Sequence, residues 1–295
     1  MRRALFIYNP IAGNRRVPRE LDKIVERFQK NNIFLEIYRI SKENEELKTI
    51  IKDSKHDMII ASGGDGTLGT ISKIIINEKI NKPFATLGTG TCNNFTHNIG
   101  MPEDLFESID VISKGKTAKV DVGIVNDKYV FLSSLAGGIF VEASFNADLD
   151  LKQKIGPFAY YFKAMSEVAN IKSYDIEIRT KEKLYKEKAH LVVVLNGTHL
   201  GNFSNVLSKS TIDISDGEME LILVKESNPI ELANLFFSIL KNENKINSDK
   251  IIVLKGNEFD IYCDETINIS IDGEKGPSLP MNVKVLEKAI EIFIP

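Results

Sequence analysis

Residues 59–67 read IIASGGDGT, an apolar run that ends in Gly-Gly-Asp-Gly-Thr. Glycine adopts positive φ angles and has no Cβ, so backbone N–H groups at such a turn can close on an anionic oxygen. A helix that begins near Thr67 would direct the positive end of its dipole at the same point. Asp65 would repel a phosphate unless a cation lay between them. The stretch therefore predicts a loop that holds a nucleotide polyphosphate with Mg²⁺. The alternative is a tight strand-to-helix turn with an aspartate cap.

The first 120 residues alternate between strand and helix patterns. We expect strands at 4–8, 33–38, 58–61 and 84–87 and helices at 18–29, 43–52 and 68–76. This βαβα order predicts a doubly wound parallel sheet, whose ligands bind at the carboxyl ends of the strands. Loops rich in Gly, Asn or Thr follow three of those ends, at residues 9–16, 62–67 and 88–94. We therefore expect one site at this edge, in a nucleotide-binding domain of residues 1–120.

From about residue 119 the pattern changes to successive strands joined by short turns. We expect strands at 119–125, 128–134, 174–180, 184–195, 218–224, 250–254, 259–262, 267–271, 283–286 and 290–294, and helices at 157–169 and 228–240. Strands in such close succession are typical of a mostly antiparallel β-sandwich. The fold class is therefore α/β, followed by a β-rich domain of residues 121–295. Whether the last strands return to the first domain is left open.

Composition narrows the class of protein. A chain of 295 residues with 43% hydrophobic and 27% charged residues is typical of a globular protein with two domains. Its net charge of −3 gives no general attraction to nucleic acid, so we expect no nucleic-acid partner. No apolar run is long enough to span a bilayer, and Cys92 and Cys263 lie far apart without histidine spacing for zinc. These features indicate a reduced, cytoplasmic protein.

Acidic residues in the second part of the chain are candidates for chemistry. Asp121 lies between valines in KVDVG. A carboxylate there costs on the order of several kcal/mol to bury unless it is paired. Asp213 and Asp216 lie in TIDISDGEMEL, where an Asp-Gly turn could fold oxygen ligands around a hard cation. Glu274 follows an Asp-Gly pair, and a carboxylate there could act as a general base. The alternatives are a solvent-facing strand residue for Asp121 and plain hairpin turns for the two Asp-Gly pairs.

Several motifs occur together in an order that resembles a known family. They are NPIAG at 9–13, IIASGGDGT at 59–67, GTCNNFTHNIGMP at 90–102, KVDVG at 119–123, IGPFAYY at 155–161, IDISDGEMEL at 212–221 and IDGE at 271–274. The chain is similar, over essentially its whole length, to bacterial diacylglycerol kinase-like lipid kinases, which are related to sphingosine and ceramide kinases. The ordered set carries the resemblance, because no single motif is decisive.

The resemblance implies an ATP site. Its expected residues are Asn9, Pro10, Ile11, Ala12, Gly13, Ser41, Gly64, Asp65, Gly66, Thr67, Leu68, Gly69, Thr70 and Thr91. It also implies that Asp65 and Asp121 anchor a catalytic Mg²⁺ network and that Glu274 takes the proton from the lipid hydroxyl. Phosphoryl transfer needs positioning, charge neutralisation and one base, which agrees with this set of residues.

The resemblance further implies a second, structural Mg²⁺. The carboxylate of Asp216 and the carbonyl groups of Asp213 and Glu218 would hold it. These are hard oxygen ligands, the kind that Mg²⁺ prefers.

Three residues depart from the family pattern. Gly69 and Thr70 replace an Asn-Glu pair, and Asn94 replaces an aspartate. We expect an ATP- and Mg²⁺-dependent kinase that phosphorylates a hydroxyl of diacylglycerol or a related lipid. Two alternatives stay open: a NAD kinase-like enzyme, which shares the GGDGT motif, and a nucleotide-binding regulatory protein whose catalysis has weakened.

A lipid substrate implies contact with a membrane. Residues 151–168 combine lysines with Phe158, Tyr160, Tyr161 and Phe162, as an interfacial element would. A packed core helix with a solvated lysine face has the same pattern. We expect ATP and a lipid as partners, with transient peripheral contact at the inner membrane face, and homodimer formation is left open.

Overall fold

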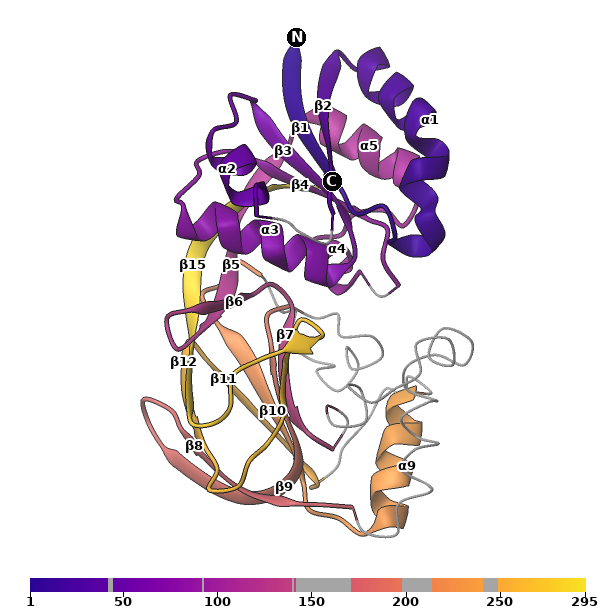
Figure 1. Ribbon diagram of the computed structural model, residues 1–295. Helices are drawn as coiled ribbons and strands as arrows, with labels where there is room; N and C mark the ends of the chain where they lie inside the picture. Colours follow the sequence, from indigo (N-terminus) through magenta and orange to yellow (C-terminus); the bar gives the residue numbers. More distant parts are fainter. Residues whose placement is uncertain (42–44, 92, 140, 142–170, 198–213, 241–248) are drawn as a thin grey trace. The chain divides into compact units, whose positions relative to one another are not determined.

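The computed structural model describes residues 1–41, 45–91, 93–139, 141, 171–197, 214–240 and 249–295 (Figure 1). The chain forms two compact units. Unit 1 comprises Met1–Val122, Ile214–Asp216 and Leu286–Pro295, and unit 2 comprises Gly123–Asp213 and Gly217–Val285. The last residues of the chain therefore belong to unit 1. The expected fold class, an α/β part followed by an antiparallel β-rich part, is confirmed.

Unit 1 contains a parallel sheet in the order β4-β3-β1-β2. Its strands are β1 (Arg2–Tyr8), β2 (Ile33–Arg39), β3 (Met58–Gly63) and β4 (Phe84–Gly88). The central strands β1 and β3 are apolar and buried over most of their length, as expected for a sheet covered on both faces. Figure 1 shows α1 (Arg16–Lys30) and α5 (Leu105–Lys114) on one face and α2 (Leu47–Lys52) and α3 (Asp65–Asn77) on the other.

The sequence analysis missed two helices of unit 1, α4 (Asn94–Asn98) and α5. The signals for α5 are present in the sequence. Asp104 caps its start by accepting from the N–H groups of Phe106 and Glu107, and Gly115 ends it at φ 80°. The helix expected to begin near Thr67 begins two residues earlier, at Asp65, and Gly64 is its N-cap.

Unit 2 is built from antiparallel strands. They are β6 (Tyr129–Phe131), β7 (Ser134–Gly138), β8 (Tyr174–Arg179), β9 (Leu184–Leu195), β10 (Met219–Lys225), β11 (Ile251–Gly256), β12 (Glu258–Tyr262), β13 (Ile269–Ile271) and β14 (Glu274–Lys275). The strands β5 (Thr117–Val125) and β15 (Met281–Phe293) have residues in both units. Helix α9 (Pro229–Leu240) packs on this sheet through Leu232 and Leu235.

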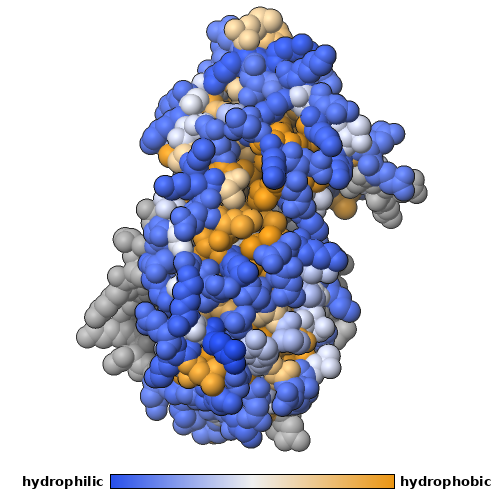
Figure 2. Space-filling model, turned by 90° about the vertical axis from the view of Figure 1, so that its left-hand side faces the viewer, coloured by the Kyte–Doolittle hydropathy of each residue, from blue (hydrophilic) through white to orange (hydrophobic). Residues whose placement is uncertain are grey.

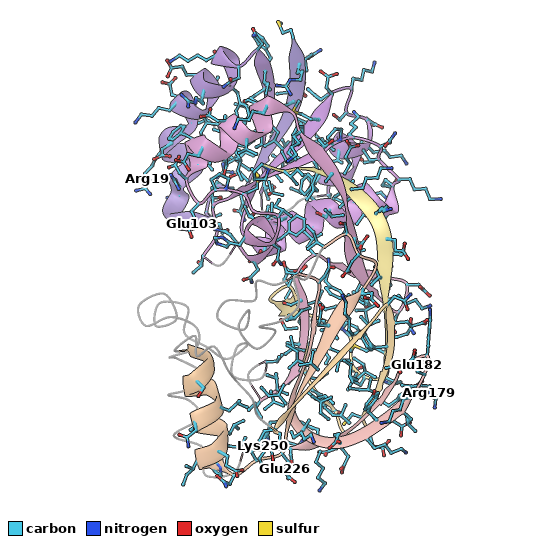
Figure 3. All side chains as sticks on the ribbon, turned by 180° about the vertical axis from the view of Figure 1, so that it is seen from behind. Arg19, Glu103, Arg179, Glu182, Glu226 and Lys250 are labelled. Carbon is cyan, nitrogen blue, oxygen red and sulfur yellow. The ribbon has the colours of Figure 1, made fainter. Side chains whose placement is uncertain are left out.

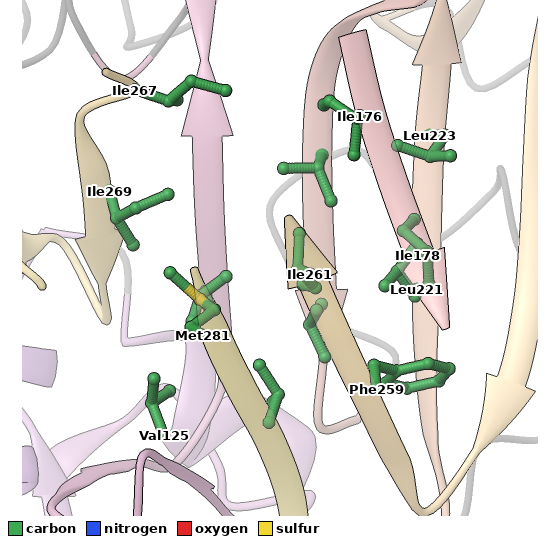
Figure 4. Packing of buried hydrophobic residues seen from close by; sticks show 14 of the residues in the cluster. Val125, Ile176, Ile178, Leu221, Leu223, Phe259, Ile261, Ile267, Ile269 and Met281 are labelled. Carbon is green, nitrogen blue, oxygen red and sulfur yellow. The ribbon is translucent and has the colours of Figure 1, made fainter. Parts of the chain in front are cut away.

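Strand β9 connects two apolar layers of unit 2. Val192 and Val194 belong to the main core, whereas Leu191 and Val193 face the layer that includes α9. The main core also contains side chains from other strands, among them Val125, Ile176, Leu221, Phe259 and Met281 (Figure 4). Charged side chains lie outside it, for example Arg179 and Glu182 at the β8–β9 turn (Figure 3). Most of the described surface in the view of Figure 2 is hydrophilic.

Two strand predictions were wrong in detail. The single strand expected at 128–134 is two strands, β6 and β7, because the N–H groups of residues 132–134 bind the Asp272 carboxylate. The strands expected at 283–286 and 290–294 form one strand, β15. The polar residues in the middle of β15 interrupt the apolar pattern, which is why two strands were expected. The Lys288 N–H in this part of the strand donates to the Asp121 carboxylate. The helix expected at 157–169 lies outside the described residues, and no helix within them is long and apolar enough to cross a bilayer.

Candidate active site

The loops that follow β1 and β3 are joined by hydrogen bonds. Asn9 donates from its backbone N–H to the Ser62 carbonyl oxygen at 2.9 Å. Its side-chain Nδ2 donates to Thr67 Oγ1 at 3.0 Å, and its Oδ1 accepts from the Ile11 N–H at 3.1 Å. Both ends of the Asn9 amide are therefore used, which fixes the first loop against the start of α3.

The loops that follow β3 and β4 approach each other through their backbones. The Thr89 N–H donates to the Gly63 carbonyl oxygen at 3.0 Å. A Cβ added to Gly90 would lie 2.4 Å from the Gly64 Cα, which is far inside van der Waals contact. Only glycine therefore fits at position 90, whereas a Cβ on Gly64 would lie 3.3 Å from the Gly90 Cα.

The first and third loops also touch. Gly13 has φ +51°, and a Cβ on it would lie 1.8 Å from the Thr89 carbonyl oxygen. Within the third loop, Asn93 Oδ1 accepts from the Gly90 N–H at 2.7 Å and Asn93 Nδ2 donates to the Gly90 carbonyl oxygen at 3.2 Å. The expected convergence of the three loops is thus confirmed, whereas their role in binding ATP stays a prediction. Sequence reasoning missed Asn93, whose residue type suits its positive φ of 53°.

Asp65 connects the second loop to the third. Its Oδ1 accepts from the Phe95 N–H at 3.2 Å, in the first turn of α4. It does not cap α3, whose first residue it is, so the simple cap interpretation was wrong. Burial raises the pKa of the Asp65 carboxyl above its ordinary value, against the opposing effect of the Phe95 and Asn94 N–H groups and of His97. A cation beside this carboxylate would restore its charged form.

The other residues expected at the nucleotide have different surroundings. Ser41 follows β2 next to the first loop, because the Ile40 N–H donates to the Tyr8 carbonyl oxygen. Leu68 is fully buried, so its side chain is not accessible to a ligand. Thr70 Oγ1 donates to the Gly66 carbonyl oxygen one turn earlier in α3. The remaining expected positions, Pro10, Ile11, Ala12, Gly69 and Thr91, are partly or fully exposed.

Asp121 is a buried residue of β5. Its side chain is 1% exposed, and its Oδ1 accepts from the Lys288 N–H at 2.6 Å. The Asp121 N–H donates to the Ile214 carbonyl oxygen at 2.7 Å. The solvent-facing alternative was therefore wrong, and the structure brings the KVDVG motif beside the start of the Asp216 turn.

The residues expected at the structural Mg²⁺ are only partly described. Asp216 is exposed, and Glu218 pairs with Lys255 at 3.1 Å. Asp213 lies outside the described residues. Within the described parts of the chain, no three His, Cys, Asp or Glu side chains gather into a metal site. The expected second metal site stays a prediction.

Glu274 lies in a short hairpin of unit 2, where it pairs with Ile271 across the turn and is exposed. Asp272 and Gly273 both have positive φ, 47° and 90°, so the Asp-Gly pair does form a hairpin turn, whereas the role of Glu274 as a general base stays a prediction. Sequence reasoning missed the role of Asp272, whose carboxylate accepts from three backbone N–H groups. The Asp-Gly pair predicts the turn, but nothing local in the sequence predicts those three partners.

Comparison with known proteins gives two family matches. Residues 3–125 match the diacylglycerol kinase catalytic domain, and residues 135–294 match the YegS C-terminal NAD kinase beta sandwich-like domain. A diacylglycerol kinase of Staphylococcus epidermidis is 30% identical over 297 residues, which cover 100% of this chain and 92% of the relative. A diacylglycerol kinase of Staphylococcus aureus is 30% identical over 298 residues, covering 100% and 93%. The crystal structure of a diacylglycerol kinase from Bacillus anthracis aligns with TM-score 0.80 and 25% identity, covering 100% and 97%.

Proposed function

Because the chain belongs to the family of bacterial diacylglycerol kinase-like lipid kinases, we propose that it transfers the γ-phosphoryl group of ATP, with Mg²⁺, to a hydroxyl of diacylglycerol or a related lipid. Lipid kinases are phosphotransferases with an alcohol acceptor. The observation that supports ATP as donor is the meeting of three loops at glycines whose Cβ positions are occupied by neighbouring backbone. The loops meet at the N-terminal end of α3, where the positive end of the helix dipole favours an anion such as a polyphosphate.

The Asp65 carboxylate would serve as a ligand of Mg²⁺. Its carboxylate is a hard oxygen ligand, and burial disfavours its charge unless a cation is near. Mg²⁺ bound there would neutralise charge on the nucleotide phosphates. Asp121 is proposed to support the same metal, since one of its oxygens is fixed by the Lys288 N–H and its orientation is therefore set. The chain itself holds the triphosphate with the three loops and keeps the Asp65 loop ordered through Phe95.

Glu274 is proposed as the general base. As the lipid hydroxyl oxygen forms its bond to the γ-phosphorus, the hydroxyl proton passes to the Glu274 carboxylate and the bond to the ADP oxygen breaks. ADP then leaves with the electron pair of that bond. Glu274 is exposed in its hairpin, so its carboxylate is accessible to a substrate.

A second candidate function rests on the match of residues 135–294, whose family name includes NAD kinase. Incubation of the pure protein with γ-labelled ATP, Mg²⁺ and either diacylglycerol vesicles or NAD separates the two. We expect label in the lipid, and only with Mg²⁺ present. Label in NAD alone would replace the proposed substrate, and no label in either acceptor would favour the nucleotide-binding regulatory protein suggested by Gly69, Thr70 and Asn94.

Two further features are proposed for the same enzyme. Asp216 holds a structural Mg²⁺ with backbone carbonyl groups, which thermal denaturation of Asp216→Ala with and without Mg²⁺ would test. The protein also visits the inner membrane face to reach its lipid. The residues first suggested for this contact, 151–168, lie outside the described part of the chain. Sedimentation with vesicles would overturn the contact if the protein stayed in the supernatant with anionic and neutral lipid alike.

A further inference from the structure

We infer that Asp272 is a positioning residue, which fixes the Glu274 carboxylate by binding the backbone between β6 and β7. This inference rests on the proposed role of Glu274 as general base. Asp272 Oδ2 accepts from the Leu132 N–H at 2.7 Å, and its Oδ1 accepts from the Ser133 and Ser134 N–H groups at 2.9 Å each. Hydrogen bonds to a charged acceptor are stronger than those between neutral groups.

The backbone that Asp272 binds is itself fixed from the opposite side. Asn196, at the end of β9, donates from Nδ2 to the Leu132 carbonyl oxygen at 3.0 Å. The Asn196 N–H donates to the Ser133 carbonyl oxygen at 2.9 Å. Leu132, Ser133 and Asn196 are each no more than 2% exposed. Asp272 is therefore anchored to a buried, hydrogen-bonded segment rather than to a surface loop.

The anchor holds the backbone next to Glu274. Between the two residues lies only Gly273, and the Asp272 N–H donates to the Ser134 carbonyl oxygen at 2.9 Å. On the other side of Glu274, the Gly276 N–H donates to the Ile269 carbonyl oxygen at 2.8 Å. Strand β14 has two residues and forms two residue pairs with β13, so it adds few contacts of its own to hold the backbone of Glu274. Removal of the Asp272 carboxylate would leave the hairpin attached through the pairing of β13 with β7 but would remove three hydrogen bonds next to Glu274.

A second turn of unit 2 shows that the turn type alone does not require this anchor. Asn126 and Asp127 also have positive φ at both turn positions, 50° and 53°. There, within the described residues, Asn126 Oδ1 accepts from the Asn282 N–H and Asp127 lies 3.9 Å from Lys284. The same turn geometry thus forms without a carboxylate that binds three consecutive N–H groups. The additional hydrogen bonds at Asp272 are therefore not needed to form the turn, and we attribute them to the positioning of Glu274.

Asp272 is not itself placed to act as the base. Its two oxygens accept from the N–H groups of three residues, so a substrate proton would have to displace an existing hydrogen bond. Glu274 is exposed and carries the carboxylate that can meet a substrate.

The test uses lipid phosphorylation kinetics of the full chain. Asp272→Gly keeps the positive φ but removes all three hydrogen bonds, and Asp272→Asn keeps Oδ1 but places an NH₂ group against the Leu132 N–H. We expect kcat to fall by on the order of 10²-fold for Asp272→Gly and less for Asp272→Asn, with the KM for ATP unchanged. Asp127→Gly is the matched control, because it replaces a turn aspartate of positive φ elsewhere in unit 2. Its kcat should equal that of the parent.

A double-mutant cycle separates positioning from a general structural role. In the Glu274→Gln background, Asp272→Gly should cause no further loss, because there is no base left to position. Additive losses, or a parental kcat for Asp272→Gly, would overturn the inference. If Asp272→Gly does not fold, Asp272→Asn carries the same cycle. A slow Glu274→Gln with a normal Asp272→Gly refutes this inference alone, whereas a normal Glu274→Gln refutes the proposed base and the inference with it.

Discussion

The three glycine-bearing loops of unit 1 and the Glu274 hairpin of unit 2 use glycine and aspartate in opposite ways. In the loops, glycines let backbones touch: a Cβ on Gly13 would lie 1.8 Å from the Thr89 carbonyl oxygen. In the hairpin, Gly273 has nothing within 4 Å of its Cβ position and supplies only a positive φ. The hairpin instead depends on the Asp272 carboxylate. We therefore expect the loops to lose stability when a side-chain atom is added to a glycine. We expect the hairpin to lose stability when the Asp272 carboxylate is removed.

The largest difference between the two regions should appear when a glycine in each is replaced by alanine. Gly13→Ala must move the backbone at Thr89 as well as strain φ, so we expect unfolding free energy to fall by on the order of 3 kcal/mol or more. Calorimetry should show no ATP binding. Gly273→Ala should cost only the backbone strain, about 1–2 kcal/mol, and bind ATP as the parent does. Equal losses of unfolding free energy for the two variants, measured by urea denaturation, would show that the loops are no more sensitive to an added Cβ than the hairpin is.

Asp65→Asn should separate charge from loop structure, because asparagine keeps the Oδ1 acceptor for the Phe95 N–H. The folded-state pKa of Asp65 is raised above 3.8, so its contribution to stability is present at low pH and is lost as pH rises through that pKa. At pH 7 without Mg²⁺ the ionised group therefore costs stability. We expect Asp65→Asn to melt at a higher temperature than the parent at pH 7, and the gap to close toward pH 4.

The same substitution should lower turnover by on the order of 10²-fold or more, because the charge that would hold the cation is gone. Asp57→Asn is the matched control, since Asp57 Oδ2 also accepts a backbone N–H, that of Arg3, at 2.7 Å. It should leave turnover unchanged. A pH-independent melting difference for Asp65→Asn, or turnover equal to the control, would remove the metal-binding role from Asp65.

A smaller effect is expected at the bond between the first two loops. Thr67→Val keeps the side-chain shape but removes the acceptor of Asn9 Nδ2. The loss of one hydrogen bond to a partly buried amide should cost about 1 kcal/mol of stability. The KM for ATP should rise by at most the corresponding factor of about five. A Thr67→Val protein that binds ATP less well than Gly13→Ala would reverse the order of importance derived from the backbone contacts.

The sequence predicted those features of the site that depend on residues close together in the chain. The βαβα order and the glycines of residues 62–67 and 88–94 were legible because apolar periodicity and the demand for positive φ or close approach act within a few residues. The same reasoning correctly placed turns at Asn126-Asp127 and Asp272-Gly273. The α5 signals, Asp104 and Gly115, were equally local and were overlooked.

The part that the sequence did not predict depends on contacts between distant segments. Asp272 meets residues 132–134, and Asp121 meets Lys288, across separations of 138 residues or more. Neither partner has a residue type that marks it, since the donors are backbone N–H groups. The polar middle of β15 likewise broke the strand pattern, although Asp121 holds it in place. Such bonds follow from tertiary structure, which no window of sequence contains.

The central claim is that unit 1 holds the nucleotide and Glu274 removes the proton. Glu274→Gln keeps the size of the side chain and its place in the β13–β14 pairing while losing basicity. The most direct measurement compares this variant with the parent for ATP affinity, by calorimetry, and for lipid phosphorylation, by label transfer. The account predicts an unchanged Kd for ATP and turnover lowered by on the order of 10²–10⁴-fold. Turnover equal to that of the parent would contradict it.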